Sequence, residues 1–247
     1  MSNAAPTDAD GIASGYLEWK NWAAEDFGRF SASEGMYFES EFGPLLNDCS
    51  NPVLLEVGFG NGSFLGWGLS RGLECCGIEI QPELVNRAEL FGLKTYPAVD
   101  DPTLQLRSGE FDLVVAFDVL EHIDQSELVA YFRSVANLLK PGGHFVARFP
   151  NGDSPFGRVF QHGDLTHVST LGQFKIKQLA SIVGLRVVSF GQSARVKAGL
   201  RVAERFRIAT GMAMRSAIDR LVSTLYFGGM KVSLSPNAVA VLQKRLP

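Results

Sequence analysis

Cysteine, histidine and long apolar runs are scarce in this chain of 247 residues, and the scarcity excludes several classes of protein. The three cysteines, Cys49, Cys75 and Cys76, form neither a disulfide framework nor a metal-finger spacing, so we expect reduced thiols in a cytoplasmic protein. No apolar run is long enough to span a membrane, and residues 1–10 lack the basic and apolar parts of a secretory signal. A net charge of −3 gives no general nucleic-acid footprint, so no nucleic-acid partner is expected.

A short apolar segment that runs into three closely spaced glycines is the most informative feature present. Residues 53–57 predict a buried parallel strand, and residues 63–71 predict a helix whose N-terminus offers free N–H groups. Glycines between them let the backbone turn sharply and approach a ligand. These glycines are Gly58, Gly60 and Gly62. Glu56 adds a carboxylate beside the turn, which suits a cationic ligand. The pattern therefore favours S-adenosylmethionine over a dinucleotide, whose G-x-G-x-x-G/A fingerprint is also not matched.

Acidic residues follow the next two predicted strands. The strand over residues 74–80 carries Glu79, about twenty positions beyond the glycine turn, where it can accept hydrogen bonds from both hydroxyls of a ribose. The strand over residues 94–98 is followed by Asp100, which is placed to accept a hydrogen bond from an adenine amino group. Both carboxylates are therefore predicted to bind the cofactor.

The remaining core pattern completes a strand–helix alternation. A fourth strand is predicted to begin at Phe111, a helix over residues 125–139 ends at a Lys-Pro-Gly-Gly stop, and a fifth strand covers residues 144–149. This series resembles the class I S-adenosylmethionine-dependent methyltransferases. The segments that carry the resemblance are 56–62, Glu79, 111–112, 118–122 and 139–143.

The resemblance implies an α/β fold with a Rossmann-like, seven-stranded, mostly parallel sheet. N-terminal helices would cover it, and a helical insertion would separate the last two strands, which form the antiparallel edge. The resemblance also implies that Phe117 and Asp118 line the methyl side of the cofactor. The expected parts are a disordered N-terminus (1–14), a helical cap (15–48), the methyltransferase core (49–191), a basic amphipathic insertion (192–235) and the last strand (236–247).

The insertion is unusual in its charge. Residues 192–231 hold eight Lys and Arg against Glu204 and Asp219, so this segment is +6 while the rest of the chain is −9. Its apolar residues recur at helical spacing. Three roles remain open: a helical cap or homodimer arm, a basic surface for an anionic acceptor such as a sugar conjugate, or peripheral membrane contact through 195–231.

Histidine is the usual general base near neutral pH for a hydroxyl acceptor. Of the four histidines, His162 and His167 share a loop with Asp164 beyond the fifth strand, where open α/β sheets bind ligands. The loop is similar to one in methyltransferases of bacterial surface-polysaccharide gene clusters, which implies O-methylation of a sugar or glycan precursor. We predict His167 as the base, His162 as the second choice and Asp164 as the residue that orients one of them. Alternatively, Asp164 and Thr166 cap the turn while His167 bonds backbone groups.

Asp118, Glu121 and His122 suggest a metal site as a further possibility. Some members of the class, including quinone and small-RNA O-methyltransferases, bind a divalent cation through E-x-x-E-H at this place. Because the first residue here is Asp and the start of a helix explains the other two, we assign no metal. The expected function is S-adenosylmethionine-dependent O-methylation of a small hydroxylated acceptor such as a sugar. The alternatives are a quinone or lipid-like phenol acceptor, and a non-catalytic cofactor-binding scaffold.

Overall fold

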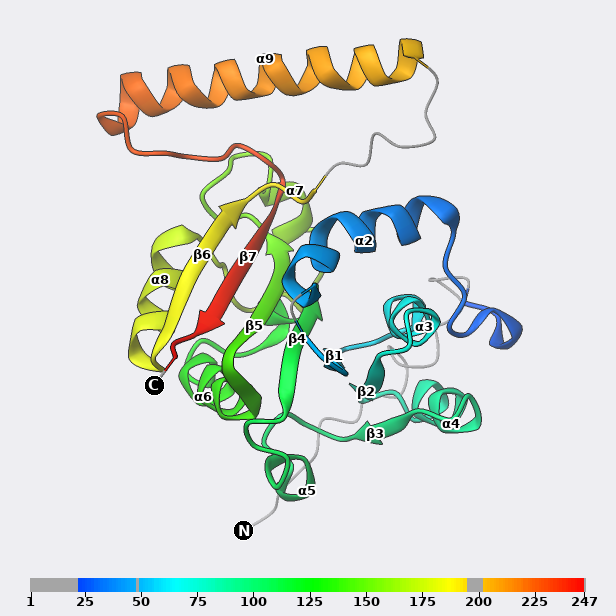
Figure 1. Ribbon diagram of the computed structural model, residues 1–247. Helices are drawn as coiled ribbons and strands as arrows, with labels where there is room; N and C mark the ends of the chain where they lie inside the picture. The colour runs from blue at the N-terminus through cyan, green and yellow to red at the C-terminus, as the bar shows by residue number, and fades with distance from the viewer. Residues whose placement is uncertain (1–21, 48, 195–201, 247) are drawn as a thin grey trace.

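The computed structural model describes residues 22–47, 49–194 and 202–246 (Figure 1). The predicted disordered segment 1–14 and residues 195–201 of the insertion lie outside these ranges. The sheet has seven strands in the order β3-β2-β1-β4-β5-β7-β6, and β7 runs antiparallel to both neighbours. This arrangement confirms the predicted seven-stranded, mostly parallel sheet. The strands are β1 (Val53–Val57), β2 (Glu74–Ile78), β3 (Lys94–Tyr96), β4 (Phe111–Phe117), β5 (Leu139–Pro150), β6 (Leu185–Gly191) and β7 (Asn237–Lys244).

Helices cover both faces of the sheet. They are η1 (Ala24–Asp26), α2 (Ala32–Leu46), α3 (Ser63–Ser70), α4 (Pro82–Leu90), α5 (Pro102–Gln105), η2 (Leu120–His122), α6 (Leu128–Leu138), α7 (Arg158–Gln161), α8 (Gln173–Ile182) and α9 (Val202–Phe227). Figure 1 shows α9 lying across the edge at which β4 and β5 end. Across residues 22–47, 49–194 and 202–246, no helix combines the length and apolar character needed to cross a membrane.

Alternating side chains of the central strands divide the core into two clusters. Leu55 packs with the cluster that contains Phe132 of α6 and Ile176 of α8. Its neighbour Leu54 packs with the other cluster, which contains Phe64 of α3. Successive side chains of a strand point to opposite faces of the sheet, so the apolar residues of β1 contribute side chains to both clusters.

The start of β5 differs from the prediction. The strand begins at Leu139 rather than at residue 144, because Leu139 pairs with Phe111 while His144 pairs with Leu113. The Lys-Pro-Gly-Gly segment ends α6 as expected, but it bulges within the strand. Lys140 Nζ lies 2.6 Å from a carboxylate oxygen of the buried Asp112, and this ion pair fixes the bulge on β4.

The N-terminal helix α2 joins the core through aromatic rings. A capping box between Ser31 and Glu34 starts the helix. Phe42 is fully buried, with its ring centroid 4.6 Å from that of Phe64 and 5.7 Å from that of Phe117. The apolar residues of α2 recur at helical spacing because they pack on the sheet. This packing places α2 beside the end of β4.

Replacement of Phe42 by alanine should lower the free energy of unfolding by about 3–5 kcal/mol, because it removes a fully buried ring from this cluster. Urea denaturation followed by circular dichroism measures the change. Leu90→Ala is the matched control, since that side chain is 90% exposed and should change stability by less than about 0.5 kcal/mol. Equal effects of the two substitutions would contradict the packing described for α2.

Candidate functional site

The glycine loop between β1 and α3 has a left-handed backbone at alternate positions. Gly58, Gly60 and Gly62 have φ of 69°, 52° and 69°. A side chain is strained at such angles, and an added Cβ at Gly60 would lie 2.7 Å from the Trp22 ring. The preceding segment also closes on the loop, since the Gly28 N–H donates to the Asn61 carbonyl at 2.8 Å. The sequence thus requires glycine here for backbone geometry and for close approach.

Glu79 connects the end of β2 to this loop. One carboxylate oxygen accepts a hydrogen bond from the Gly60 N–H at 3.1 Å, and the other accepts from the N–H groups of Ile80 and Gln81. The side chain is half-buried at the carboxyl edge of the sheet. The structure therefore places this acidic acceptor against the glycine loop, as the predicted cofactor site requires.

Glu56 lies beneath the loop with part of its hydrogen-bonding capacity unused. The residue is 4% exposed, and within the described ranges its Oε2 atom has no hydrogen-bond partner. Burial raises the pKa of Glu56 well above its usual range, against a backbone hydrogen bond from Leu65. An unsatisfied buried carboxyl beside a helix N-terminus fits a ligand that brings a positive charge, which S-adenosylmethionine would do.

Asp100 and its neighbour follow β3 and have different roles. The Asp101 carboxylate caps α5 by accepting hydrogen bonds from the backbone N–H groups of Thr103 and Leu104. Asp100 is exposed in the adjoining turn. Capping commits Asp101 to the fold, so Asp100 remains the carboxylate for the predicted adenine contact.

At the end of β4, Asp118 forms an ion pair that the sequence analysis did not foresee. Asp118 is a non-glycine residue with φ of 55°, and its carboxylate accepts two hydrogen bonds from Arg148 at the end of β5. The Arg148 guanidinium also lies 4.9 Å from the centroid of the Phe117 ring. Burial works against the charge of Arg148, but the hydrogen bonds that the guanidinium donates to Asp118 outweigh it and raise the pKa of the guanidinium. The predicted methyl side is therefore lined by a fixed charge pair over an aromatic ring.

A second cluster unites η2 with the loop that follows α7. Ligand atoms of Glu121, His122 and His167 lie within 4.8 Å of one another. The two imidazole centroids are 4.6 Å apart. Glu121 is 1% exposed, and in the part of the chain that the structure describes neither carboxylate oxygen has a hydrogen-bond partner. Burial raises the pKa of Glu121 to about 8.

One hydrogen bond sets the tautomer of His167. The Phe160 carbonyl lies 3.1 Å from Nδ1 of His167 and can only accept, so that nitrogen carries the proton and Nε2 presents its lone pair in the neutral ring. Nε2 lies 4.0 Å from Glu121 Oε1 and 3.9 Å from Asp164 Oδ2. The Nε2 lone pair of the neutral ring therefore faces two carboxyl groups.

The loop residues predicted from sequence divide between two roles. Asp164 Oδ1 accepts hydrogen bonds from the N–H and the hydroxyl of Thr166, which is the capping arrangement held open as the alternative. Its other oxygen faces His167. His162 is exposed at the end of α7 and is not in the cluster. His122, which was attributed to the start of a helix, takes its place.

One carboxylate and two imidazoles can hold a divalent cation or carry a proton. Asp118, which the sequence analysis considered as a ligand with Glu121 and His122, is instead engaged by Arg148. His167, forty-five positions beyond His122 in the chain, completes the group. Only the tertiary fold brings these side chains together.

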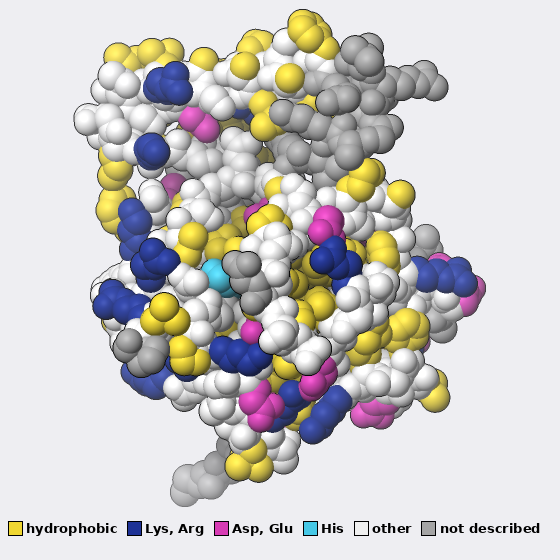
Figure 2. Space-filling view, in the orientation of Figure 1, with side chains coloured by type: hydrophobic (Ala, Val, Ile, Leu, Met, Phe, Trp, Pro, Cys, Tyr) yellow, Lys and Arg dark blue, Asp and Glu magenta, His cyan; other side chains and the backbone are white. Residues whose placement is uncertain are grey.

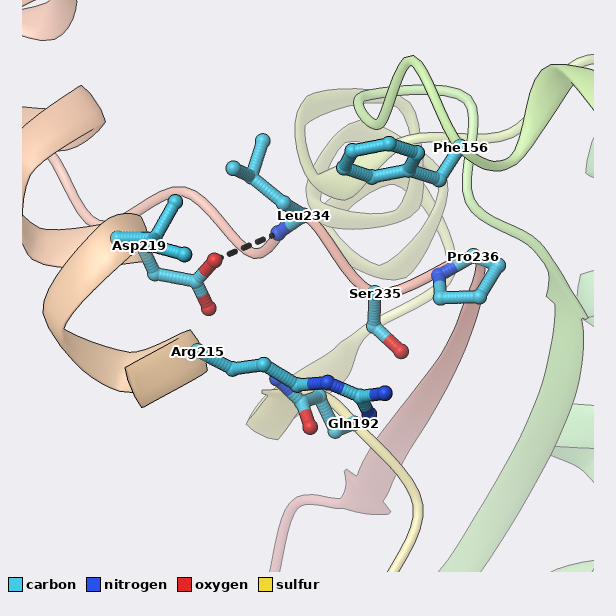
Figure 3. Close-up of a pocket in the computed structure, with 8 residues that line it drawn as sticks. Phe156, Gln192, Arg215, Asp219, Leu234, Ser235 and Pro236 are labelled. Atoms are coloured by element: carbon cyan, nitrogen blue, oxygen red, sulfur yellow. Dashed lines mark hydrogen bonds between the residues drawn. The ribbon is translucent and has the colours of Figure 1, made fainter. Parts of the chain in front are cut away.

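A pocket of about 400 Å³ opens between α9 and the carboxyl edge of the sheet (Figure 3). Phe156 and Pro236 line it from the domain, while Arg215 and Ile218 line it from α9. Figure 3 shows the Arg215 side chain reaching toward Ser235 beneath the helix. The pocket joins apolar walls to Arg215 and Asp219, which suits an amphipathic molecule.

The affinity of the protein for S-adenosylmethionine should rise with pH through the raised pKa of Glu56. A bound cation favours the ionised carboxylate, so binding to the neutral form must release a proton. Calorimetric titration in two buffers of different ionisation enthalpy measures that release. Glu56→Gln should bind more weakly and release fewer protons. Equal affinity and equal proton release in both proteins would contradict this role.

Comparison with known proteins identifies the family and the fold. Residues 38–190 match the family model described as a methyltransferase domain. A ubiquinone biosynthesis O-methyltransferase from Xanthomonas oryzae pv. oryzae is 35% identical over 103 residues, which are 39% of this chain and 42% of that relative. The match therefore spans less than half the length of the curated relative.

Two solved structures share the fold. A SAM-dependent methyltransferase from Archaeoglobus fulgidus has a TM-score of 0.61 at 16% identity, over 93% of this chain and 98% of the other. An S-adenosylmethionine-dependent methyltransferase from Mesorhizobium loti has a TM-score of 0.53 at 15% identity, over 83% and 98%. The family model covers more than half of the chain and supports S-adenosylmethionine as the cofactor. The chain belongs to the methyltransferase-domain family, with the class I fold that its sequence predicted.

Proposed function

We propose that this protein transfers a methyl group from S-adenosylmethionine to a hydroxyl oxygen of a small acceptor, with His167 as the general base. The observation that carries the proposal is the geometry of His167: its Nδ1 bonds the Phe160 carbonyl, so the Nε2 lone pair faces Glu121 and Asp164. A hydroxyl is a weak nucleophile until a base accepts its proton, whereas an amine acceptor needs less help.

The chain's own residues have separable tasks in this account. The glycine loop, Glu56, Glu79 and Asp100 hold the cofactor, whose methyl group is attached to a positive sulfur. Arg148 holds the Asp118 carboxylate and covers the Phe117 ring, so this side of the site keeps one geometry. Nε2 of His167 takes the acceptor proton, and the Asp164 carboxylate, 3.9 Å from that nitrogen, stabilises the imidazolium that forms.

The acceptor has two candidate classes. The similarity of the loop with His162, Asp164 and His167 to polysaccharide-cluster methyltransferases supports a sugar or glycan precursor, and Arg215 in the pocket would suit an anionic conjugate. The similarity to ubiquinone biosynthesis O-methyltransferases supports a quinone-type phenol, which the apolar walls of the same pocket would accommodate. Of the two, we favour the phenol, because both the relatives and the pocket walls support it.

Labelled methyl transfer separates these candidates. The protein is incubated with S-adenosylmethionine that carries an isotopic methyl label and, in parallel, with prenylated catechols and with sugar nucleotides. Label should enter the phenols at a hydroxyl oxygen. Label in the sugar nucleotides alone would reverse the preference. Tight cofactor binding without label in any acceptor fraction would favour the non-catalytic scaffold.

His167→Ala should lower the rate of methyl transfer by about 10²- to 10⁴-fold, because the substitution removes the general base. Cofactor binding should be unchanged, because the residues of the cofactor site are still present. His162→Ala is the matched control and should keep the wild-type rate, since that side chain is exposed and outside the cluster. Both rates come from the labelled-methyl assay.

Two results would overturn the role of His167. One is full activity of His167→Ala. The other is loss of wild-type activity on chelation that an added divalent cation restores, which would assign Glu121, His122 and His167 to a metal instead.

A further inference from the structure

Helix α9 exposes an apolar stripe that nothing in the described structure covers. Phe206, Met214, Leu221 and Leu225 are 71%, 66%, 59% and 67% exposed, and Ile218 is half exposed. At about 100° per residue these five side chains fall within an arc of about 120° on one face of the helix. Figure 2 shows apolar side chains along the outer surface of α9, at the top of the molecule.

Basic side chains border this stripe. By the same helical spacing, Arg220 lies beyond one edge of the stripe, and the exposed Arg207 lies within it near one end. Arg215 and Asp219 lie on the side of the helix that lines the pocket, where the Asp219 carboxylate accepts a hydrogen bond from the Leu234 N–H at 3.2 Å. The outward face therefore combines apolar side chains with the positive charges of Arg207 and Arg220.

The side of α9 that faces the domain is already occupied. Ser223 is buried, and its hydroxyl accepts a hydrogen bond from the Val232 N–H at 3.1 Å. Together with the bond between Asp219 and Leu234, this contact fixes the rotation of the helix about its axis. The segment between α9 and β7 thus holds the apolar stripe outward. The exposure of the stripe follows from these two hydrogen bonds.

From this arrangement we propose that the outer face of α9 binds the surface of an anionic lipid bilayer. An apolar stripe with arginines on the same face lets the apolar side chains enter the acyl boundary while the guanidinium groups remain at the phosphate level. A second copy of the chain fits less well, because pairing two such faces would bring arginines against arginines.

The placement of α9 gives this attachment a consequence. The helix lies across the carboxyl edge of the sheet, and the pocket lined by Arg215 and Ile218 opens beneath it. A bilayer on the outer face would therefore lie across α9 from the pocket, and a lipid-like acceptor would reach the pocket around the helix. Membrane binding itself does not depend on the proposed function, since it uses side chains outside the cofactor site.

Co-sedimentation with vesicles tests the proposal. The full chain is mixed with vesicles of phosphatidylglycerol and phosphatidylcholine, and with vesicles of phosphatidylcholine alone. Binding should occur on the anionic vesicles and weaken as salt is raised, because screening reduces the attraction of the arginines. The double variant Leu221→Glu/Leu225→Glu should partition at least about tenfold more weakly.

Leu90→Glu on α4 is the matched control, because it places the same charge at a 90% exposed leucine away from α9, and it should bind vesicles like wild type. Circular dichroism and cofactor binding establish that each variant is folded. Vesicle binding that is absent from wild type, or unchanged in the double variant, would overturn the proposal. So would a wild-type dimer, measured by analytical ultracentrifugation without lipid, that the double variant converts to monomer.

Discussion

The left-handed backbone at Gly58, Gly60 and Gly62 is the constraint on which the rest of the site depends. Because no side chain projects from these positions, the Glu79 carboxylate reaches the Gly60 N–H, and the rings of Trp22 and Phe27 close over the loop. The first turn of α3 begins at the same loop, and its Leu65 N–H donates a hydrogen bond to the buried Glu56 carboxyl. Each of these contacts would be lost or strained if a Cβ atom were added.

Two chemically different halves meet at the carboxyl edge of the sheet. The half predicted to hold the cofactor is made of short local segments, each at the end of β1, β2 or β3. The half proposed to meet the acceptor depends on the ion pair between the distant Asp118 and Arg148 and on the group formed by Glu121, His122 and His167. In this second half Asp118 is ion-paired and Glu121 is buried. The division explains why a family-wide cofactor can be combined with different acceptors on one fold.

Sequence patterns located the segments around the glycine loop but not the side chains that gather around His167, for a physical reason. Apolar strands, the glycine turn and Glu79 are local patterns, so they could be assigned without knowledge of the tertiary fold. His122 could not be placed beside His167, because only the packing of η2 against the loop after α7 brings their rings together. Arg148 carried no signal, since an arginine within a strand is usually solvated. Strand β5 begins early because Leu139 pairs with Phe111. The sequence did not indicate this pairing, because the Pro-Gly-Gly segment after Leu139 is typical of a turn between a helix and a strand.

The most direct test of this account is calorimetric titration of S-adenosylmethionine and S-adenosylhomocysteine into wild type, Glu79→Ala and the surface control Glu83→Ala. The account predicts one binding site in wild type and in the control, with binding at least about tenfold weaker in Glu79→Ala, because hydrogen bonds to a charged group are lost. The thermal unfolding temperature of each protein shows whether the variant is folded as stably as wild type. No binding of either ligand to folded wild type, or equal binding to all three proteins, would contradict the account.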